Sequence, residues 1–143
     1  MAKYQLTMTE KQARTVIAAC DFLARIRIGQ WKELVDLCLP YDRENIDEWC
    51  QKRDDAELLI MSVRDKVMPE LSYNASYGVY KFEETERAIN VLKAVRSAIA
   101  WHNKPEGGYE VIYDRPHAHN VAEEMPKCEV VDDGQDETNG GAD

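Results

Sequence analysis

Four stretches of this 143-residue chain repeat apolar residues at intervals of three and four, the spacing that places them on one face of an α-helix. The predicted helices run from Thr7 or Thr9 to about Ile28, from Gln30 to about Leu39, from Asp42 to about Val67, and from Glu83 to about His102. Residues that stop helices follow the first three, namely Gly29, Pro40 and Pro69. The predicted fold class is therefore mainly α, a helical bundle of about four helices.

The first helix is predicted to begin with a capping box of Thr7 and Glu10, and Thr9 with Gln12 is the alternative register. Thr7 with Glu10 and Thr9 with Gln12 both place a hydroxyl three positions before an acid or an amide, which is the spacing of a capping box. Asp42 is the predicted cap of the third helix, because short acidic side chains accept the free N–H groups of a helix start.

The third helix carries a heptad-like seam, since its apolar positions alternate in steps of three and four. The seam consists of Ile46, Trp49, Arg53, Ala56, Ile60, Val63 and Val67. It predicts packing beside another long helix and offers a surface for a homo-oligomer. Arg53 is its charged member, and a snorkelling side chain is a better interpretation than a ligand contact.

Three short segments alternate apolar and polar residues and are predicted to form a small peripheral β element against the helices. They are Lys3–Thr7, Tyr109–Tyr113 and Pro126–Val131. Residues 1–131 are predicted to form a single helical domain, and residues 132–143 a disordered acidic C-terminal tail.

The formal net charge of −9 is concentrated at one end of the chain. Residues 120–143 hold eight acids and one base, and the other residues carry a net −2. General nucleic-acid binding is not expected, because it needs a basic face. No apolar run approaches the ~20 residues of a membrane span. Since the first residues do not resemble a signal peptide, the expected location is the cytoplasm.

No motif in the sequence supplies a catalytic set. There is no nucleophile elbow, no glycine loop of the nucleotide-hydrolase type and no pair of histidines on a helix. His117 and His119 are close in sequence, but no dense ligand cluster accompanies them, and a solvated loop is the better interpretation. The chain is therefore predicted to be non-enzymatic, with no cofactor and no metal.

The connector Asn74–Lys81 joins the two longest predicted helices and carries more polar and aromatic residues than a turn needs. It precedes a helix start, where free N–H groups and the helix dipole favour an anion. Ser76 offers a hydroxyl, Gly78 permits close backbone approach, Tyr77 offers a ring for stacking, and Lys81 adds positive charge. The alternative is a tight interhelix turn whose tyrosines cover the core.

A second polar set lies at the bend after the first helix and consists of Arg25, Arg27, Gly29 and Gln30. Arg27 lies close to the apolar stripe, so its guanidinium must reach water or find an acceptor. Arg25 is a candidate ligand contact, or else it pairs with Asp21 four residues earlier. Arg96 of the last helix is a further candidate, and the sequence does not show whether it faces either connector.

Three motifs in this chain resemble small bacteriophage-encoded accessory proteins of unknown function. They are Phe22–Gln30, with Arg-Ile followed two residues later by Gly-Gln, then Asn74–Val79, and Ala88–Arg96 leading to Ala100-Trp101. The resemblance covers roughly residues 5–105. Arg27 departs from the small residue typical of that position, and the acidic tail lies outside the resemblance.

The resemblance implies a phage accessory protein acting in the bacterial host cytoplasm, where such proteins often counter host defence. One hypothesis is a factor that binds and sequesters a nucleotide-type immune signal. Ser76, Gly78 and Lys81 would hold phosphate, and Tyr77 would stack on the base. Arg25 or Arg96 would neutralise the remaining negative charge of the ligand.

The alternative hypothesis is an acidic protein–protein inhibitor or adaptor that acts on a host defence protein. Its candidate anchors, where exposed, are Trp31, Trp49, Tyr73 and Tyr77. The two hypotheses predict different surfaces. Sequestration requires Ser76, Gly78 and an arginine to converge on a pocket. A protein-binding factor requires a broad apolar or acidic patch, with its arginines paired internally.

Overall fold

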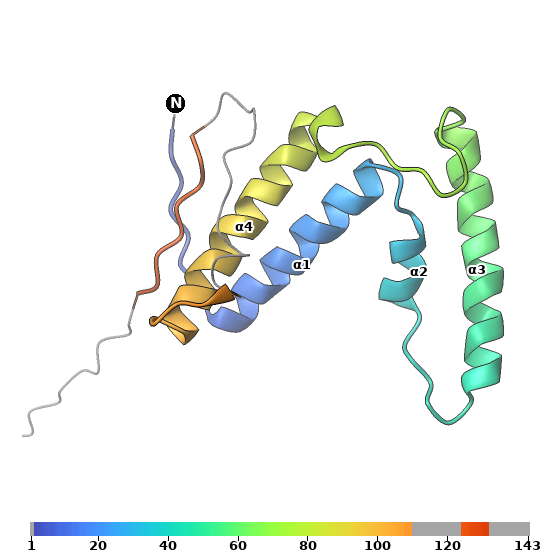
Figure 1. Ribbon diagram of the computed structural model, residues 1–143, viewed down its shortest axis with the longest axis horizontal. Coiled ribbons are helices and arrows are strands. Elements are labelled where there is room, and N and C mark those ends of the chain that lie inside the picture. Colours follow the sequence, from blue (N-terminus) through green and yellow to red (C-terminus); the bar gives the residue numbers. More distant parts are fainter. Residues whose placement is uncertain (1, 110–123, 132–143) are drawn as a thin grey trace, which may run out of the picture.

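The computed structural model describes residues 2–109 and 124–131 of the chain. Their elements are α1 (Glu10–Arg27), α2 (Lys32–Cys38), α3 (Ile46–Val67), the short 3-10 helix η1 (Val79–Lys81) and α4 (Glu83–Asn103). Figure 1 shows the long helices α1, α3 and α4 with the shorter α2 between α1 and α3. The prediction of a mainly helical fold with about four helices is confirmed.

The start of α1 follows the second of the two predicted registers. The side chain of Thr9 accepts the N–H of Gln12, and the side chain of Gln12 accepts the N–H of Thr9 at 2.9 Å. The prediction for Asp42 was wrong in detail. Its carboxylate accepts the N–H of Asn45 at 3.1 Å, so it closes the turn before α3, and α3 begins at Ile46.

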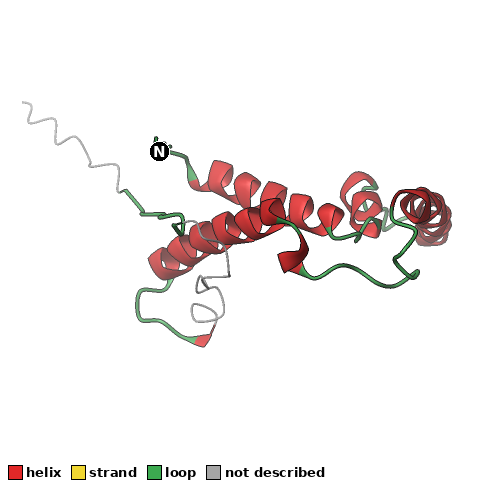
Figure 2. Cartoon of the chain, turned by 90° about the horizontal axis from the view of Figure 1, so that it is seen from above, coloured by secondary structure: helices red, strands yellow, loops and turns green. Residues whose placement is uncertain are grey.

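Helices α1 and α4 lie side by side and form the body of the molecule (Figures 1 and 2). The buried apolar residues between and beside them are mostly small or branched, and they include Ala24, Ile28, Ala88, Leu92 and Val95. Small side chains allow two helix backbones to approach closely, and the apolar area removed from water stabilises their pairing.

Residues 31–73, which we call the arm, contain α2 and α3. Helix α3 packs on α2 and has no comparable packing against α1 or α4. In Figure 2 the arm lies beyond one end of the paired helices of the body. The residues of α3 that are most covered are Glu57, Met61 and Arg64, which share one side of the helix. Most of the remaining surface of α3 is therefore open to solvent.

The predicted peripheral β element is not found in the described residues. The segments 2–9 and 124–131 form neither strand nor helix, although the ion pair between Lys3 and Glu124 at 2.6 Å joins them. Tyr4 is 96% exposed and Leu6 is 74% exposed, so their alternation does not mark a face that packs on the core. Residues 110–113, which make up most of the predicted strand Tyr109–Tyr113, lie outside the described residues, as does the predicted tail at 132–143. Among the helices described, none is long and apolar enough to cross a membrane.

Candidate functional site

The two polar connectors predicted from the sequence meet in space. The N–H of Tyr77 donates to the carbonyl of Ile28 at 2.8 Å. Gly29 has a φ of +94°, a conformation that glycine adopts without strain, and a Cβ at this position would lie 2.6 Å from Cδ1 of Leu71. Residues 28–31 and 71–78 therefore form one compact crossing between the body and the arm, which we call the junction.

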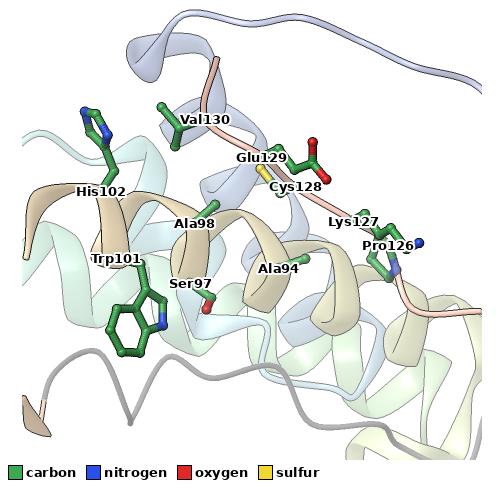
Figure 3. A pocket seen from close by; sticks show the side chains of 10 residues that line it. All are labelled: Ala94, Ser97, Ala98, Trp101, His102, Pro126, Lys127, Cys128, Glu129 and Val130. Carbon is green, nitrogen blue, oxygen red and sulfur yellow. The ribbon is translucent and has the colours of Figure 1, made fainter. Parts of the chain in front are cut away.

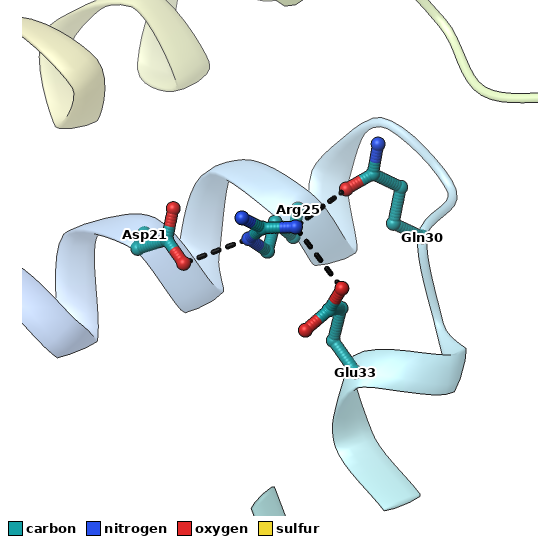
Figure 4. A network of polar contacts seen from close by, with 4 residues as sticks. All are labelled: Asp21, Arg25, Gln30 and Glu33. Carbon is teal, nitrogen blue, oxygen red and sulfur yellow. Dashed lines mark hydrogen bonds and ion pairs between the residues drawn. The ribbon is translucent and has the colours of Figure 1, made fainter. Parts of the chain in front are cut away.

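Arg25 is held by three side chains near the junction, as Figure 4 shows. Its Nε donates to Asp21 at 2.7 Å, while its Nη1 donates to Glu33 at 3.0 Å and to Gln30 at 3.3 Å. The hydrogen bond to Asp21 is the main cause that raises the pKa of the Arg25 guanidinium. The predicted pairing with Asp21 is confirmed, and Gln30, also a predicted site residue, is an acceptor in the same network.

Two cations and two aromatic rings form a cluster beside the junction. The guanidinium of Arg27 lies 4.7 Å from the ring centre of Phe82, and Nζ of Lys81 lies 5.4 Å from that of Tyr77. The two rings meet edge to face at 5.6 Å. Arg27 also forms an ion pair with Glu84 at 3.3 Å, so its guanidinium has found an acceptor. We call Arg27, Tyr77, Lys81 and Phe82 the cation–aromatic cluster.

The other predicted site residues take different positions. Ser76 and Gly78 are exposed in the connector, and a Cβ at Gly78 would meet nothing within 4 Å. Gly78 has a φ of −67°, so its backbone does not require glycine. Arg96 lies thirteen residues along α4 from Glu83, about 20 Å from the start of that helix at 1.5 Å per residue. The fold brings Gln30 to Arg25, but it places Arg96 well away from the junction.

Arg64 closes the junction from within the arm. It is 1% exposed and donates to the carbonyls of Ser72 at 3.0 Å and Ala75 at 3.2 Å, while Asp65 accepts at 2.8 Å. The indole N–H of Trp31 similarly donates to the carbonyl of Ile26 at the end of α1, at 2.9 Å. Neither role was predicted. The sequence does not reveal the role of Arg64, because its acceptors are main-chain carbonyls, which every residue carries.

Beside the surface that packs on α2, helix α3 carries a stripe of apolar residues. We call it the apolar stripe, and it consists of Trp49, Ala56, Leu59, Val63 and Val67. Leu59, Val63 and Val67 are between 49% and 72% exposed. The predicted seam therefore exists in the sequence, but no long helix among the described residues covers it. Arg53 pairs with Asp36 at 2.9 Å and Glu57 at 3.2 Å, so it is an internal ion-pair partner at the edge of the seam.

The other free side of α3 is acidic. Asp47, Asp54 and Asp65 are spaced so that they lie on the same side of α3 as the exposed Leu58, a surface that we call the acidic face. The arm as a whole holds eleven acids and six bases, a net charge of −5. The described body, residues 2–30, 74–109 and 124–131, holds eight acids and eleven bases, a net charge of +3. The fold thus combines an acidic arm with a basic body, although in the sequence the arm lies between two parts of that body.

Of the predicted aromatic anchors, Tyr73 is exposed, whereas Trp31, Trp49 and Tyr77 are partly covered. Tyr73 lies under Nζ of Lys32 at 5.0 Å, and Trp49 packs edge to face on Tyr41 at 5.1 Å. The exposed apolar surface of the arm therefore comes chiefly from aliphatic side chains of α3.

A cleft of about 580 Å³ separates the C-terminal half of α4 from residues 126–130, which run alongside that helix (Figure 3). Its walls include Ala94, Ala98 and Trp101 on the helix and Cys128 on the facing segment. Partial burial raises the pKa of the Cys128 thiol, so this thiol resists ionisation. None of the seven predicted site residues lines this cleft.

Over the part of the chain that the structure describes, no group of three or more metal-binding side chains gathers. His117 and His119 lie outside the described residues.

Comparison with known proteins provides no family for this chain. No protein-family model, no curated protein sequence and no solved structure matches it. The resemblance to bacteriophage accessory proteins remains a prediction.

Proposed function

We propose that this chain is a non-enzymatic protein-binding factor, an acidic inhibitor or adaptor that docks its arm on a basic surface of a partner protein. The observation that carries this proposal is the separation of charge, with a net −5 on the arm and +3 on the described body. The resemblance to phage accessory proteins would make the partner a host defence protein in the bacterial cytoplasm.

The acidic face supplies the contact that this function needs. Leu58 is 62% exposed and provides an apolar centre, while Asp54 one turn away and Asp47 further along the same side provide charge that attracts a basic partner. Complementary charge of this kind speeds encounter and excludes wrong partners, while the apolar centre contributes to affinity. Arg25, Arg53 and Arg64 are all paired within the chain, which is the pattern that favours protein binding over ligand capture.

The test uses paired charge variants. Asp47→Asn with Asp54→Asn removes two acids from the acidic face, and Glu10→Gln with Glu106→Gln removes two exposed acids from the body. Each pair includes one acid of a first helical turn, so the lost attraction to the helix dipole is matched, and the body variant also loses the exposed ion pair of Glu10 with Arg14. A partner captured from host lysate is purified, and its dissociation constant is measured at two salt concentrations.

We expect the arm variant to bind roughly tenfold more weakly and with a smaller salt dependence, while the body variant binds like the wild type. Equal weakening by both variants would mean that only net charge matters. Unchanged binding by the arm variant would refute the acidic face as the contact surface.

A second candidate function is sequestration of a nucleotide-type signal, which the cation–aromatic cluster favours. Tyr77 and Phe82 offer π-surfaces between the positive charges of Lys81 and Arg27, a chemistry that suits a planar anionic ligand. Against it, the donors that Arg25 uses for Asp21, Gln30 and Glu33 would first have to be released from those acceptors.

This second candidate is tested by thermal shift against cyclic dinucleotides, cyclic oligonucleotides and ADP-ribose derivatives. A ligand at 100 times its dissociation constant adds about 2.7 kcal/mol to the free energy of unfolding. The shift is expected to disappear in Lys81→Ala and to weaken in Ser76→Ala, because both side chains are exposed at the connector. If no ligand of the panel shifts the transition, sequestration of these signals is rejected.

A further inference from the structure

We propose that the apolar stripe of α3 is covered by the same stripe of a second copy of this chain, packed antiparallel. The stripe extends along a 22-residue helix, a length of about 33 Å at 1.5 Å per residue, and most of it is open to solvent. Its members recur in steps of seven, three, four and four, which keeps them on one side of the helix, as in helices that pair along a seam.

The order of residues along the stripe suits an antiparallel pair. With Ala56 of one copy opposite Ala56 of the other, Val63 of each copy lies level with Trp49 of the other copy. The small side chain at the centre allows the helices to approach, and the larger residues then fill the space on both sides of it. The exposed Leu59 and Val67 extend the same contact in both directions from Val63.

The charges along the stripe are also self-complementary in this orientation. Glu48 and Lys66 lie on the same flank near opposite ends of α3, and both are exposed. In an antiparallel pair like flanks meet, so Glu48 of each copy lies within two residues, about 3 Å along the axis, of Lys66 of the other. In a parallel pair in register, these two residues would be about 27 Å apart along the axis.

The excess acid of the arm does not oppose this pairing. The flank of the stripe carries Glu48 and Asp55 but also Lys52 and Lys66, so its charges balance. The acidic face lies on the far side of α3, and in the pair it points outward. Pairing of the stripes thus leaves two acidic faces free, one on each copy, for the partner proposed above.

The first test is the mass of the full chain in solution, measured by light scattering over a range of concentrations. We expect a species of twice 16.4 kDa that dissociates on dilution. Val63→Glu is expected to weaken the dimer by about a hundredfold or more, because it places two charges in the contact. Leu58→Glu is the matched control, since its side chain is also exposed but lies on the acidic face. Circular dichroism of each variant shows whether the helices remain.

The second test determines the orientation through charge exchange. Glu48→Lys alone and Lys66→Glu alone are each expected to weaken the dimer by roughly tenfold, because two attractive pairs become repulsive. An equimolar mixture of the two variants, or the double variant, is expected to recover the affinity of the wild type. A parallel dimer in register would show neither the loss nor the recovery.

A monomer at every concentration overturns the proposal, as does a dimer that Val63→Glu leaves intact. A dimer that ignores the charge exchange overturns the antiparallel arrangement. These outcomes are separable from those for the proposed function, because Asp47→Asn with Asp54→Asn changes partner binding and leaves the dimer unchanged. Conversely, unchanged partner binding by the Asp47→Asn, Asp54→Asn variant of a chain that dimerises counts against the proposed function alone.

Discussion

Replacing Arg64 with methionine is the sharpest test of how the junction holds the arm. Arg64 is 1% exposed, and its guanidinium donates to the carbonyls of Ser72 and Ala75. Each hydrogen bond from a charged donor contributes about 1.5–3 kcal/mol. The pair with the half-exposed Asp65 contributes less than about 1 kcal/mol. Because methionine retains part of the apolar stem packing, Arg64→Met is expected to lower the free energy of unfolding by about 3–4 kcal/mol.

The loss is measured by urea unfolding followed by circular dichroism. With a slope of roughly 2 kcal/mol per molar urea, the midpoint is expected to fall by about 1.5–2 M. Arg14→Met is the control, since Arg14 is exposed and its pair with Glu10 contributes less than about 0.5 kcal/mol. If Arg64→Met costs no more than 1 kcal/mol beyond this control, on the order of a single weak hydrogen bond, the clamp on the junction is refuted.

Three further changes test other parts of the structure. Gly29→Ala is expected to cost about 2–3 kcal/mol in urea unfolding, because alanine at a φ of +94° is strained and its Cβ would crowd Leu71; a neutral effect would contradict this backbone geometry. Thr9→Ala is expected to cost about 1 kcal/mol by the same assay, through loss of the α1 cap, and Thr9→Ser should recover most of it. The side chain and the backbone N–H of Asn45 donate hydrogen bonds to Asp42 and lower the pKa of its carboxyl group. The stability that the Asp42 carboxylate contributes is therefore present above its unfolded pKa and is lost as pH falls through its lower folded pKa. A carboxyl titration by NMR is expected to show a lowered pKa for Asp42 that rises toward the ordinary value in Asn45→Ala.

The helices were predictable because their signals are local. The spacing of apolar residues and the breakers between them place α1 and α4 within a few residues of their observed bounds. The capping box predicted first, Thr7 with Glu10, was wrong, and the alternative register, Thr9 with Gln12, is the one that forms. The strand predicted at Lys3–Thr7 was wrong because alternation identifies a strand only where one face is covered, and Tyr4 and Leu6 are largely exposed.

The tertiary roles of polar residues were much less predictable. The pair of Asp21 with Arg25 follows from a spacing of four within one helix, but the contact of Arg25 with Glu33 depends on how α2 turns back after Gly29. Arg64 was not predicted because its acceptors are main-chain carbonyls eight and eleven residues further on. Carbonyls carry no sequence signature, so only the folded position of the loop reveals the contact.

The connector that is richest in polar and aromatic residues contributes mainly to positioning. Tyr77 bonds to the end of α1 through its backbone, and Arg64 holds the carbonyls before it, so the connector fixes how the arm leaves the body. The ring of Tyr77 packs edge to face on Phe82 at 5.6 Å and lies 5.4 Å from Nζ of Lys81, so a ligand would have to displace contacts that the connector already makes. The surface of α3 carries no such commitment, since its exposed aliphatic and acidic residues are not needed to cover the core. Substitutions in the junction should therefore change stability and, through the position of the arm, binding as well. Substitutions of the exposed residues of the apolar stripe and the acidic face should change binding alone.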